Sequence, residues 1–487
     1  MAITRQNLTL NTFYKGIQQD DIVGSSFGVI ESKNIDWLRT WYWATLWPKT
    51  TKQLLTSTTA MRTLESRNWS WDTGEAYAAW DWGNIYRLDA TDSTPTFTLT
   101  WGEDIQAWQH FSTAIKYYFM KETSNNFFSL CSVPSNEADL DNWTNLIENV
   151  KTTMYSPNSP AMYANTSFLY VWYSNSVLQI DSAWVQTIFA IFNPAVNGIT
   201  QHWTQFYIYS SNWMLSLWDW VSNSVSANIN LWFRVRRVIS KAWLDYITTE
   251  TWDVYIVSWY SSQLFSEYKQ SNRLNDNSQY IKKLDFKTDI YDNKTLAFTW
   301  NDLMLISNET QAWIYKYWDL IPWIQKGFHK ITTEDNTWTN LDNIYTMVYE
   351  EALNTLYFSY KQGSIYWIDK LELDNLTTSQ DWYIVTQIFR WPPNKVAKIE
   401  RIRCTTSYTN WDNYIKLYKR INNASSWTLF YTINDDTNII ERHDISSEVD
   451  DFIDIQFKME IHNDLQTNLP PILHWFELTY TITEENG

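Results

Sequence analysis

Short runs in which apolar and polar residues alternate recur along most of the chain, and each is followed by a polar turn and a second run of the same kind. A two-residue period is typical of half-buried β-strands, so each pair of runs predicts a β-hairpin. Seven such pairs are AYAAWDWGNIYRLD (76–89), KYYFMKETSNNFFSL (116–130), FLYVWYSNSVLQID (168–181), QFYIYSSNWMLSLW (205–218), DVYIVSWYSSQLFSEY (253–268), DLMLISNETQAWIYKY (302–317) and TLYFSYKQGSIYWID (355–369).

The hairpins repeat at regular intervals. The residues that mark the first run of each pair are Tyr77, Tyr118, Tyr170, Tyr207, Tyr255, Met304 and Tyr357. Their spacing is close to the ~40 to 50 residues of a four-stranded propeller blade. Because one such sheet cannot bury both of its faces alone, a closed ring of sheets is the arrangement that buries them all. We therefore predict a β-propeller of about seven blades over 61–388. A large sandwich or two unrelated β domains are the alternatives.

The pattern changes on either side of the repeats. After Trp391-Pro392-Pro393 come longer alternating runs, which predict a C-terminal β-sandwich over 389–487, about 100 residues long. Residues 1–60 have little periodicity and are too polar to form a core of their own. We predict that they form an extended N-terminal arm that lies on the propeller or on a partner. The predicted fold class is thus all-β, with one short helical insertion over 138–153, where ADLDNWTNLIENVKTT shows helical periodicity.

The composition conflicts with this many tight turns. Glycine usually makes up about 7% of a chain, or roughly 34 residues at this length, but this chain has 10 Gly and 32 Trp. Many of the tryptophans adjoin Asp, Asn or Pro, as in Trp80-Asp81-Trp82, Trp218-Asp219-Trp220 and Trp47-Pro48. With Gly in place of Trp, these steps become strong turn signals at which a positive φ is needed.

We therefore interpret most of the tryptophans as glycines in the native protein, written as Trp because a UGA codon was translated with a table that assigns it to Trp. Some uncultivated bacterial lineages, and the phages that infect them, resemble this case in reading UGA as Gly. In the alternative interpretation the tryptophans are real and form stacking platforms on a carbohydrate-binding protein. Trp475 lies in a strand-like run and fits either interpretation.

Charge and segment composition exclude some classes of protein. The chain has 37 Lys+Arg and 54 Asp+Glu, so its net charge of −17 disfavours nucleic acid as a partner. Cys131 and Cys404 lie far apart without a metal-binding or redox spacing, and we expect both to be small buried hydrophobic residues. We find no apolar signal segment and no run of about 18 apolar residues, so we expect a soluble protein that is not inserted into a membrane.

The chain lacks the short sequence motifs of common enzyme families. We find no HExxH, GxSxG, Walker or GxGxxG motif. The six histidines lack paired ligand spacing and are interpreted as surface or core residues; they are His110, His202, His329, His443, His462 and His474. We therefore predict no catalytic, cofactor-binding or metal-binding residue and no cofactor.

Two further groups of charged residues have structural interpretations. The acidic residues near the hairpins, which a glycosidase would need as facing carboxylates, are interpreted as turn residues; they are Asp81, Asp219, Asp253 and Asp302. Arg234, Arg236 and Arg237 lie in a β-like run and are interpreted as a solvated strand face or a contact at the propeller rim.

Two segments resemble a known group of proteins. The run FYKGIQQDDIVGSSFGVIESKNID (13–36), followed by LWPKT, resembles the opening of phage virion proteins that continue into a propeller. The segment DIQFKMEIHNDLQTNLPPILHWFELTYTI (454–482) is similar to the closing strands of the same proteins, which end a sandwich. The resemblance implies a structural component of a tailed phage particle, in the tail or its host-contacting end, and it implies no catalytic residue.

Three functions follow as hypotheses. The first is a non-enzymatic virion tail protein, made in the host cytoplasm, which assembles with other virion proteins and with copies of itself. The second is a receptor- or glycan-binding protein, for which a host surface glycan is the partner. The third is a glycan-degrading propeller enzyme, which would need an acidic cluster at the ring axis.

Overall fold

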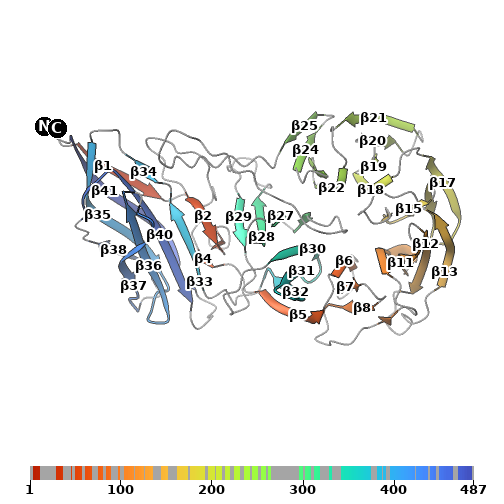
Figure 1. Ribbon diagram of the computed structural model, residues 1–487, viewed down its shortest axis with the longest axis horizontal. Coiled ribbons are helices and arrows are strands. Elements are labelled where there is room, and N and C mark those ends of the chain that lie inside the picture. Colours follow the sequence, from red (N-terminus) through yellow and green to blue (C-terminus); the bar gives the residue numbers. More distant parts are fainter. Residues whose placement is uncertain are drawn as a thin grey trace.

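The computed structural model consists almost entirely of β-strands (Figure 1). No helix in its described residues is long and apolar enough to cross a membrane. The residues that it describes are 4–10, 29–33, 35–36, 45–46, 50–57, 61–67, 75–80, 84–88, 97–98, 104–114, 116–124, 127–134, 144–151, 162–173, 176–191, 196–202, 205–210, 214–219, 224–230, 235–241, 244–249, 254–258, 261–264, 296–299, 302–308, 312–318, 328–331, 342–374, 381–386, 388–390, 395–422, 424–436, 439–445, 449–463 and 470–484.

Seven antiparallel four-stranded sheets follow one another along the chain. The first three consist of β6 (Met61–Arg67), β7 (Glu75–Trp80), β8 (Asn84–Arg87) and β9 (Phe97–Thr98); β10 (Asp104–Phe111), β11 (Lys116–Ser124), β12 (Phe127–Pro134) and β13 (Thr144–Lys151); and β14 (Met162–Ala164), β15 (Leu169–Tyr173), β16 (Ser176–Ile180) and β17 (Gln186–Ile191). A short 3₁₀ turn, η3 (Ser112–Ala114), joins β10 to β11.

The next three sheets have the same strand order. They consist of β18 (Val196–His202), β19 (Gln205–Ser210), β20 (Met214–Asp219) and β21 (Ser224–Asn230); β22 (Val235–Lys241), β23 (Leu244–Thr249), β24 (Val254–Ser258) and β25 (Ser261–Leu264); and β26 (Leu296–Phe298), β27 (Asp302–Asn308), β28 (Ala312–Trp318) and β29 (Phe328–Ile331). The seventh consists of β30 (Asn343–Glu350), β31 (Thr355–Gln362), β32 (Ile365–Glu372) and β5 (Thr50–Ser57).

The seven sheets form a closed ring. The first strand of each sheet contacts the first strand of the next, and β30 of the last sheet returns to contact β6 of the first. Figure 1 shows the sheets placed around this ring. The ring is sealed by β5, which precedes the first sheet in sequence but pairs with β32 of the last. The predicted all-β propeller class is confirmed by this pairing and ring order.

Both faces of an internal sheet are buried, so its central strands carry apolar residues at successive positions. On β15, Leu169 and Val171 enter the core shared with the second sheet. Tyr170 and Trp172 point to the opposite side, into the core shared with the fourth sheet. In that second core, Tyr170 lies 4.6 Å from Phe206, measured between ring centroids. Each sheet therefore depends on its two neighbours for burial of its apolar side chains.

Six of the seven predicted hairpins coincide with the second and third strands of a sheet. The fifth, over 253–268, is the exception, because its strands are β24 and β25, the third and fourth of their sheet. In this sheet the second and third strands are β23 and β24. The residue that corresponds to the first-run markers of the other hairpins is therefore Tyr246, which is fully buried, and not Tyr255. Three similar runs follow one another here, and the pattern alone does not fix which two form the central hairpin.

The predicted helix over 138–153 is wrong where the structure describes it. Residues 144–151 form β13, which pairs with β12 as the fourth strand of the second sheet. Strand pairing outweighs the weak helical pattern because the open edge of β12 offers a row of backbone partners. The remaining residues of that prediction, 138–143 and 152–153, lie outside the described part of the chain.

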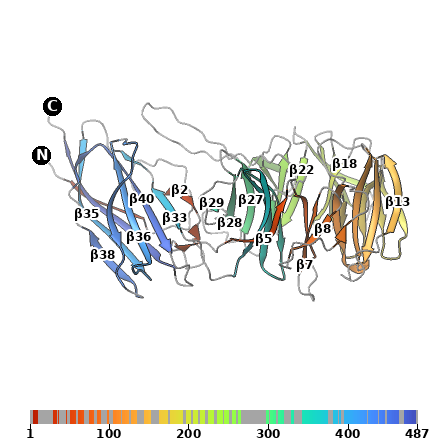
Figure 2. The ribbon, with the colours of Figure 1, turned by 60° about the horizontal axis from the view of Figure 1, so that its bottom comes forward.

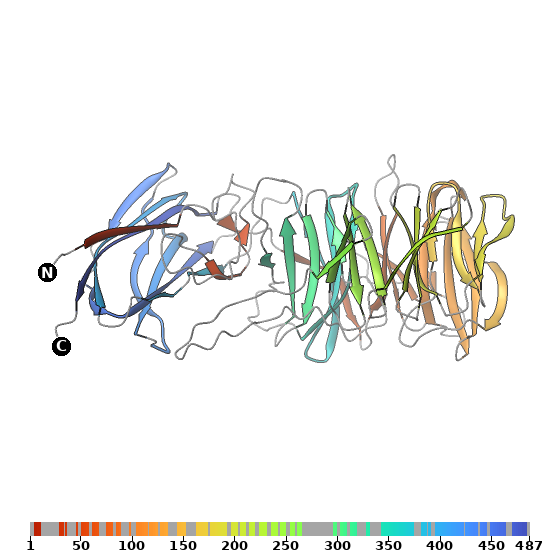
Figure 3. The same ribbon diagram turned by 90° about the horizontal axis from the view of Figure 1, so that it is seen from above.

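Two sheets make up a β-sandwich at one end of the molecule (Figures 2 and 3). The five-stranded sheet contains β1 (Thr4–Leu10), β41 (Ile472–Glu484), β35 (Lys395–Ser407) and β38 (Glu441–Ile445), with β39 (Val449–Phe452) also on β35. The six-stranded sheet contains β2 (Val29–Lys33), β33 (Asp381–Thr386), β40 (Asp454–Asn463), β36 (Asn413–Ile421) and β37 (Thr428–Ile433), with β34 (Phe389–Arg390) on β40. One core of buried side chains from both sheets fills the space between them, including Cys404, Leu417, Phe457 and Phe476.

The domain limits differ from the predicted ones at both ends. Within the predicted arm, β1 pairs with β41 and β2 pairs with β33, so both belong to the sandwich sheets, while β5 belongs to the propeller. A two-stranded ladder of β3 (Ile35–Asp36) and β4 (Thr45–Leu46) lies between them in sequence. Strand β33, which the prediction placed in the propeller, pairs with β40 of the sandwich. The polar N-terminal segment has no core of its own, and it is stabilised because its strands pair with strands of the sandwich and of the propeller.

Candidate functional site

The structure separates most of the residues that the sequence singled out. His110, His202 and His329 lie on three different propeller sheets, on β10, β18 and β29. Asp219 lies on β20 and Asp302 begins β27, whereas Asp81 and Asp253 are outside the described residues. Arg236 and Arg237 lie on β22, and Arg234 is outside the described residues.

Two of the remaining histidines, His443 and His474, lie on the two strands that flank the end of β35. Strand β35 finishes with Thr406 and Ser407, both buried. The Thr406 hydroxyl lies 2.9 Å from Nε2 of His443 on β38, and the Ser407 hydroxyl lies 2.9 Å from Nε2 of His474 on β41. The two hydroxyls thus place one imidazole on either side of β35. We call this group, together with the carboxylates near His443, the sandwich-end cluster.

His443 faces two carboxylates. Its Nδ1 lies 3.3 Å from Oδ2 of Asp435, a residue that follows β37 of the opposite sheet. Glu441 lies two positions before His443, on the same side of β38. One donor atom from each of Asp435, Glu441 and His443 lies within 4.8 Å of the other two. The imidazole is buried while both carboxylates are exposed, so the group is accessible from solvent on its acidic side.

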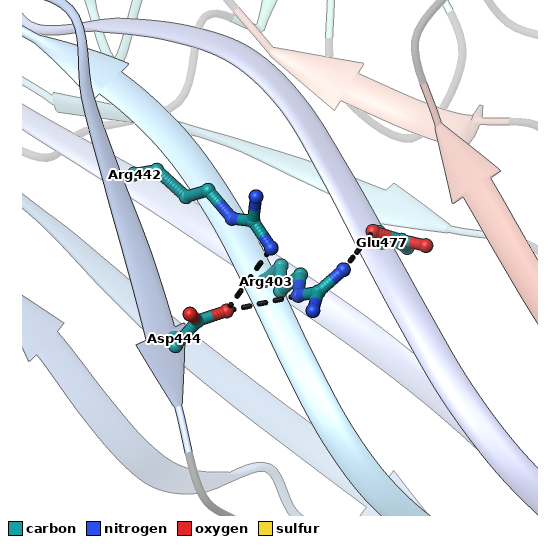
Figure 4. Close-up of polar contacts among 4 residues, drawn as sticks. All are labelled: Arg403, Arg442, Asp444 and Glu477. Atoms are coloured by element: carbon teal, nitrogen blue, oxygen red, sulfur yellow. Dashed lines mark hydrogen bonds and ion pairs between the residues drawn. The ribbon is translucent and has the colours of Figure 1, made fainter.

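The other side of β38 carries a network of ion pairs (Figure 4). The Nε atom of Arg403 on β35 lies 2.9 Å from Oδ1 of Asp444, and its second guanidinium nitrogen lies 3.5 Å from Glu477 on β41. Arg442 approaches the same Asp444 oxygen at 3.6 Å. These residues are partly exposed, so the network adds modest stability. It nevertheless links β38 to β35 and β41, and so fixes the strand that carries Glu441 and His443.

His474 lies on β41, on the other side of β35 from His443. Burial lowers the pKa of His474 to about 4. The imidazole is therefore neutral at neutral pH, and its hydrogen bond with Ser407 holds it in the wall of the sandwich.

This burial predicts a stability change with pH. In the unfolded chain a histidine takes up a proton near pH 6.5, whereas His474 in the folded protein does so only near pH 4. The folded state thus loses stability as pH falls through this interval, by up to about 1.4 kcal/mol per pH unit. We expect His474→Gln, which keeps an amide near Ser407 but does not titrate, to flatten the pH dependence of the urea-unfolding free energy between pH 5 and 6.5. An unchanged slope in the variant would contradict the assignment to His474.

A second polar group lies on the six-stranded sheet, around Glu460 of β40. Burial by itself would raise the pKa of Glu460, but hydrogen bonds from His462, Lys458 and Tyr418, with the charge of Lys458, lower this pKa to about 2. The Lys458 ammonium lies 4.7 Å from the ring centroid of Tyr383. This face therefore combines aromatic rings with a carboxylate that is ionised at all physiological pH values.

The strand pairing defines the chain as an all-β protein in which a β-propeller is joined to a two-sheet sandwich. No family model matches it, and no curated protein matches it. Among solved structures it is similar to the WD40 β-propeller domain of Doa1, with 10% identity, a TM-score of 0.43 and coverage of 66% of this chain and 97% of that chain.

Two other solved structures show a similar likeness. Chaetomium thermophilum Raptor has 9% identity, a TM-score of 0.43 and coverage of 67% of this chain and 29% of that chain. A chain of the mitotic checkpoint complex has 10% identity, a TM-score of 0.44 and coverage of 73% and 96% respectively. At these values the likeness carries no conclusion about function, and the ring is established by its own strand pairing.

Proposed function

We propose that this protein is a non-enzymatic structural component of a bacteriophage tail. In this proposal it is made in the host cytoplasm and assembles through propeller and sandwich surfaces with other virion proteins and with copies of itself. The observation that carries the assembly role is the outer strand of the third propeller sheet, β17. Its neighbourhood exposes three large apolar side chains, Val185, Ile188 and Ile191, at 57%, 62% and 66%.

An exposed apolar edge is unfavourable on an isolated protein. In the described part of the chain β17 pairs only with β16, so no described strand covers its other edge, which lies next to the exposed Val and Ile side chains. Soluble proteins usually protect such edges with charges, proline or a covering segment. A surface of this kind is expected where a neighbouring subunit covers it.

The two segments that carry the resemblance to phage virion proteins also belong to the same sandwich. Residues 13–36 contain β2, and residues 454–482 contain β40 and β41. Strand β33 pairs with β2 on one side and with β40 on the other, so both segments contribute to one sheet. The resemblance thus concerns a single sandwich built from the two ends of the chain, which supports a shared architecture.

Trp184 supports the proposal that UGA encodes glycine in the source of this protein. It ends the turn between β16 and β17, where its N–H donates to the Asp181 carbonyl at 3.1 Å and the Asp181 carboxylate accepts from the Val185 N–H at 2.7 Å. Its φ is 67°, in the left-handed region that a residue with a β-carbon adopts at a cost. Among the described residues, Gly363, Asn354 and Asn422 also have positive φ, and these are the residue types that tolerate it.

Among the described residues, no other tryptophan has a positive φ. Trp172 lies in the middle of β15 with a fully packed ring, 1% exposed, in the core between the third and fourth sheets. Tyr408, at φ 58°, shows that an aromatic residue can occupy the left-handed region in this chain. The assignment is therefore made residue by residue, and among the described tryptophans the backbone favours glycine most directly at Trp184.

Native material tests both parts of the proposal. We expect peptide mass spectrometry of particles from the natural host to find this chain among the virion proteins, with glycine at positions 80, 82, 184, 218 and 220. Gold-labelled antibodies against the chain should mark the tail in electron micrographs. Tryptophan at all five positions would refute the recoding, whereas a chain that is missing from purified particles would refute the tail role.

A receptor- or glycan-binding role is the second candidate. The partly exposed Tyr414 and Tyr418 lie on the outward side of β36, beside Lys458 and Glu460 of β40, and aromatic rings beside hydrogen-bonding groups suit sugar rings. A glycan array probed with the full chain would test this role. Binding that Tyr414→Ala and Tyr418→Ala abolish would favour it over a purely structural role, and hydrolysis of a bound glycan would instead indicate an enzyme.

A further inference from the structure

The carboxylates of the sandwich-end cluster and His443 come from both sheets. Asp435 follows β37 of the six-stranded sheet, whereas Glu441 and His443 belong to β38 of the five-stranded sheet. A ligand held by all three would connect the sheets at their open end. The connection between these strands is short, since only residues 434–440 separate β37 from β38.

The spacing of the donor atoms fits a metal ion. The carboxylate oxygens and the imidazole nitrogen lie within 4.8 Å of one another, and the shortest described separation is 3.3 Å. Two ligands bound to one ion at about 2.0–2.2 Å must lie roughly 3 to 3.5 Å apart. Small side-chain rotations of the exposed Asp435 and Glu441 would complete this arrangement, while the buried His443 stays in place.

His443 is oriented as a metal ligand would be. Thr406, whose side chain is fully buried, lies 2.9 Å from Nε2, so this nitrogen can donate its proton to the threonine hydroxyl. In that tautomer the Nδ1 lone pair faces Asp435 and Glu441. Metal-bound histidines characteristically donate their other ring N–H to a neighbouring oxygen, which fixes both the tautomer and the ring.

The donor set selects the class of cation. One imidazole nitrogen and two carboxylate oxygens suit Zn²⁺ and similar divalent transition metals, whereas Mg²⁺ and Ca²⁺ prefer sites made of oxygen alone. The charge of the ligands also fits a divalent cation, because two carboxylates and a neutral imidazole together carry two negative charges. The nearby Arg403 and Arg442 do not supply the balancing charge, since both are engaged with Asp444 in the ion-pair network.

We propose that Asp435, Glu441 and His443 bind a divalent transition-metal cation that joins the two sheets at this end of the sandwich, with the remaining coordination positions open to water. The role is structural, because the cation would tether the segment that follows β37 to His443 and Glu441 of β38, and so join the two sheets at this end. This inference is independent of the phage-tail proposal and would hold whatever the chain assembles with.

Calorimetric titration of the full chain with ZnCl₂, after treatment with a chelator and dialysis, tests the proposal. We expect one saturable site and a rise in the melting temperature of the sandwich when Zn²⁺ is bound. Asp435→Asn and Glu441→Gln should each weaken binding at least about 10-fold, because each removes one charged ligand. Both side chains are exposed, so these variants are expected to fold.

The matched control is Asp436→Asn. Asp436 is an exposed acidic neighbour of Asp435 but is not part of the cluster, so its variant should bind Zn²⁺ like the parent protein. Equal weakening by the Asp435 and Asp436 variants would show diffuse attraction to surface acids and would overturn the site. Absence of saturable Zn²⁺ binding, or equally tight binding of Ca²⁺ or Mg²⁺, would overturn it as well.

Discussion

Replacement of Phe476 by alanine is expected to lower the unfolding free energy of the sandwich by about 3–5 kcal/mol. The Phe476 ring is fully buried, and its centroid lies 5.1 Å from that of Phe457 on the opposite sheet. The pair therefore spans the interface between the two sheets. Removing one ring costs its transfer free energy and leaves a cavity that the paired strands around it cannot close.

Urea unfolding of the full chain, followed by a probe on the sandwich, would measure this effect. Ile439→Ala is the matched control, because Ile439 lies between β37 and β38 of the same sandwich but is 73% exposed. Its effect should stay within about 0.5 kcal/mol. If both variants shifted the transition equally, the Phe457–Phe476 contact would not be part of the stabilising core.

The propeller could be predicted from the sequence because its hairpin pattern is repeated along the chain. Similar hairpins recur along the chain, and burial on both sides of a sheet places apolar residues such as Tyr170 and Val171 at successive positions. Seven occurrences made the fold class predictable even where a single hairpin was misassigned. In the fifth sheet the shift by one strand left the predicted class unchanged.

The limits of the domains could not be predicted from the sequence in the same way. Strand β13 has the composition of a helix, and it is a strand because β12 offers it an edge. Strands β1, β2 and β5 are polar and weakly periodic, and each is defined by a partner more than 300 residues further along the chain. Local sequence patterns do not show which distant strands will pair, so these strands could not be assigned from the sequence.

The sandwich-end cluster was only partly visible in the sequence. Asp435, Glu441 and His443 are close together along the chain, but whether their side chains meet depends on where β37 ends and which face of β38 each residue occupies. Thr406, which orients His443, is brought in by the pairing of β35 with β38. Short histidine motifs therefore do not reveal the site, because Thr406, which orients His443, lies on a different strand.

The largest effect on the propeller is expected from its closing strand. Thr51→Pro combined with Lys52→Pro should destabilise the ring by at least about 3 kcal/mol. Of two adjacent residues one directs its N–H toward β32, so the pair of prolines removes a ladder hydrogen bond and distorts β5. Strand β5 leads directly into β6, the first strand of the first sheet. Pairing of β5 with β32 thus ties the first sheet to the last, and its loss leaves the junction held mainly by packing of β30 against β6.

The same substitution in an outer strand that does not close the ring isolates this effect. Ser262→Pro with Gln263→Pro disrupts β25, which pairs with β24 in the hairpin that ends the fifth sheet. We expect this variant to fray only that edge, whereas the β5 variant should speed hydrogen exchange in both β30–β32 and β6–β7. Equal destabilisation by the two double variants, with exchange confined to the altered strand in each, would mean that the ring is held closed by packing between its sheets and that the β5–β32 pairing adds no more than any other outer ladder.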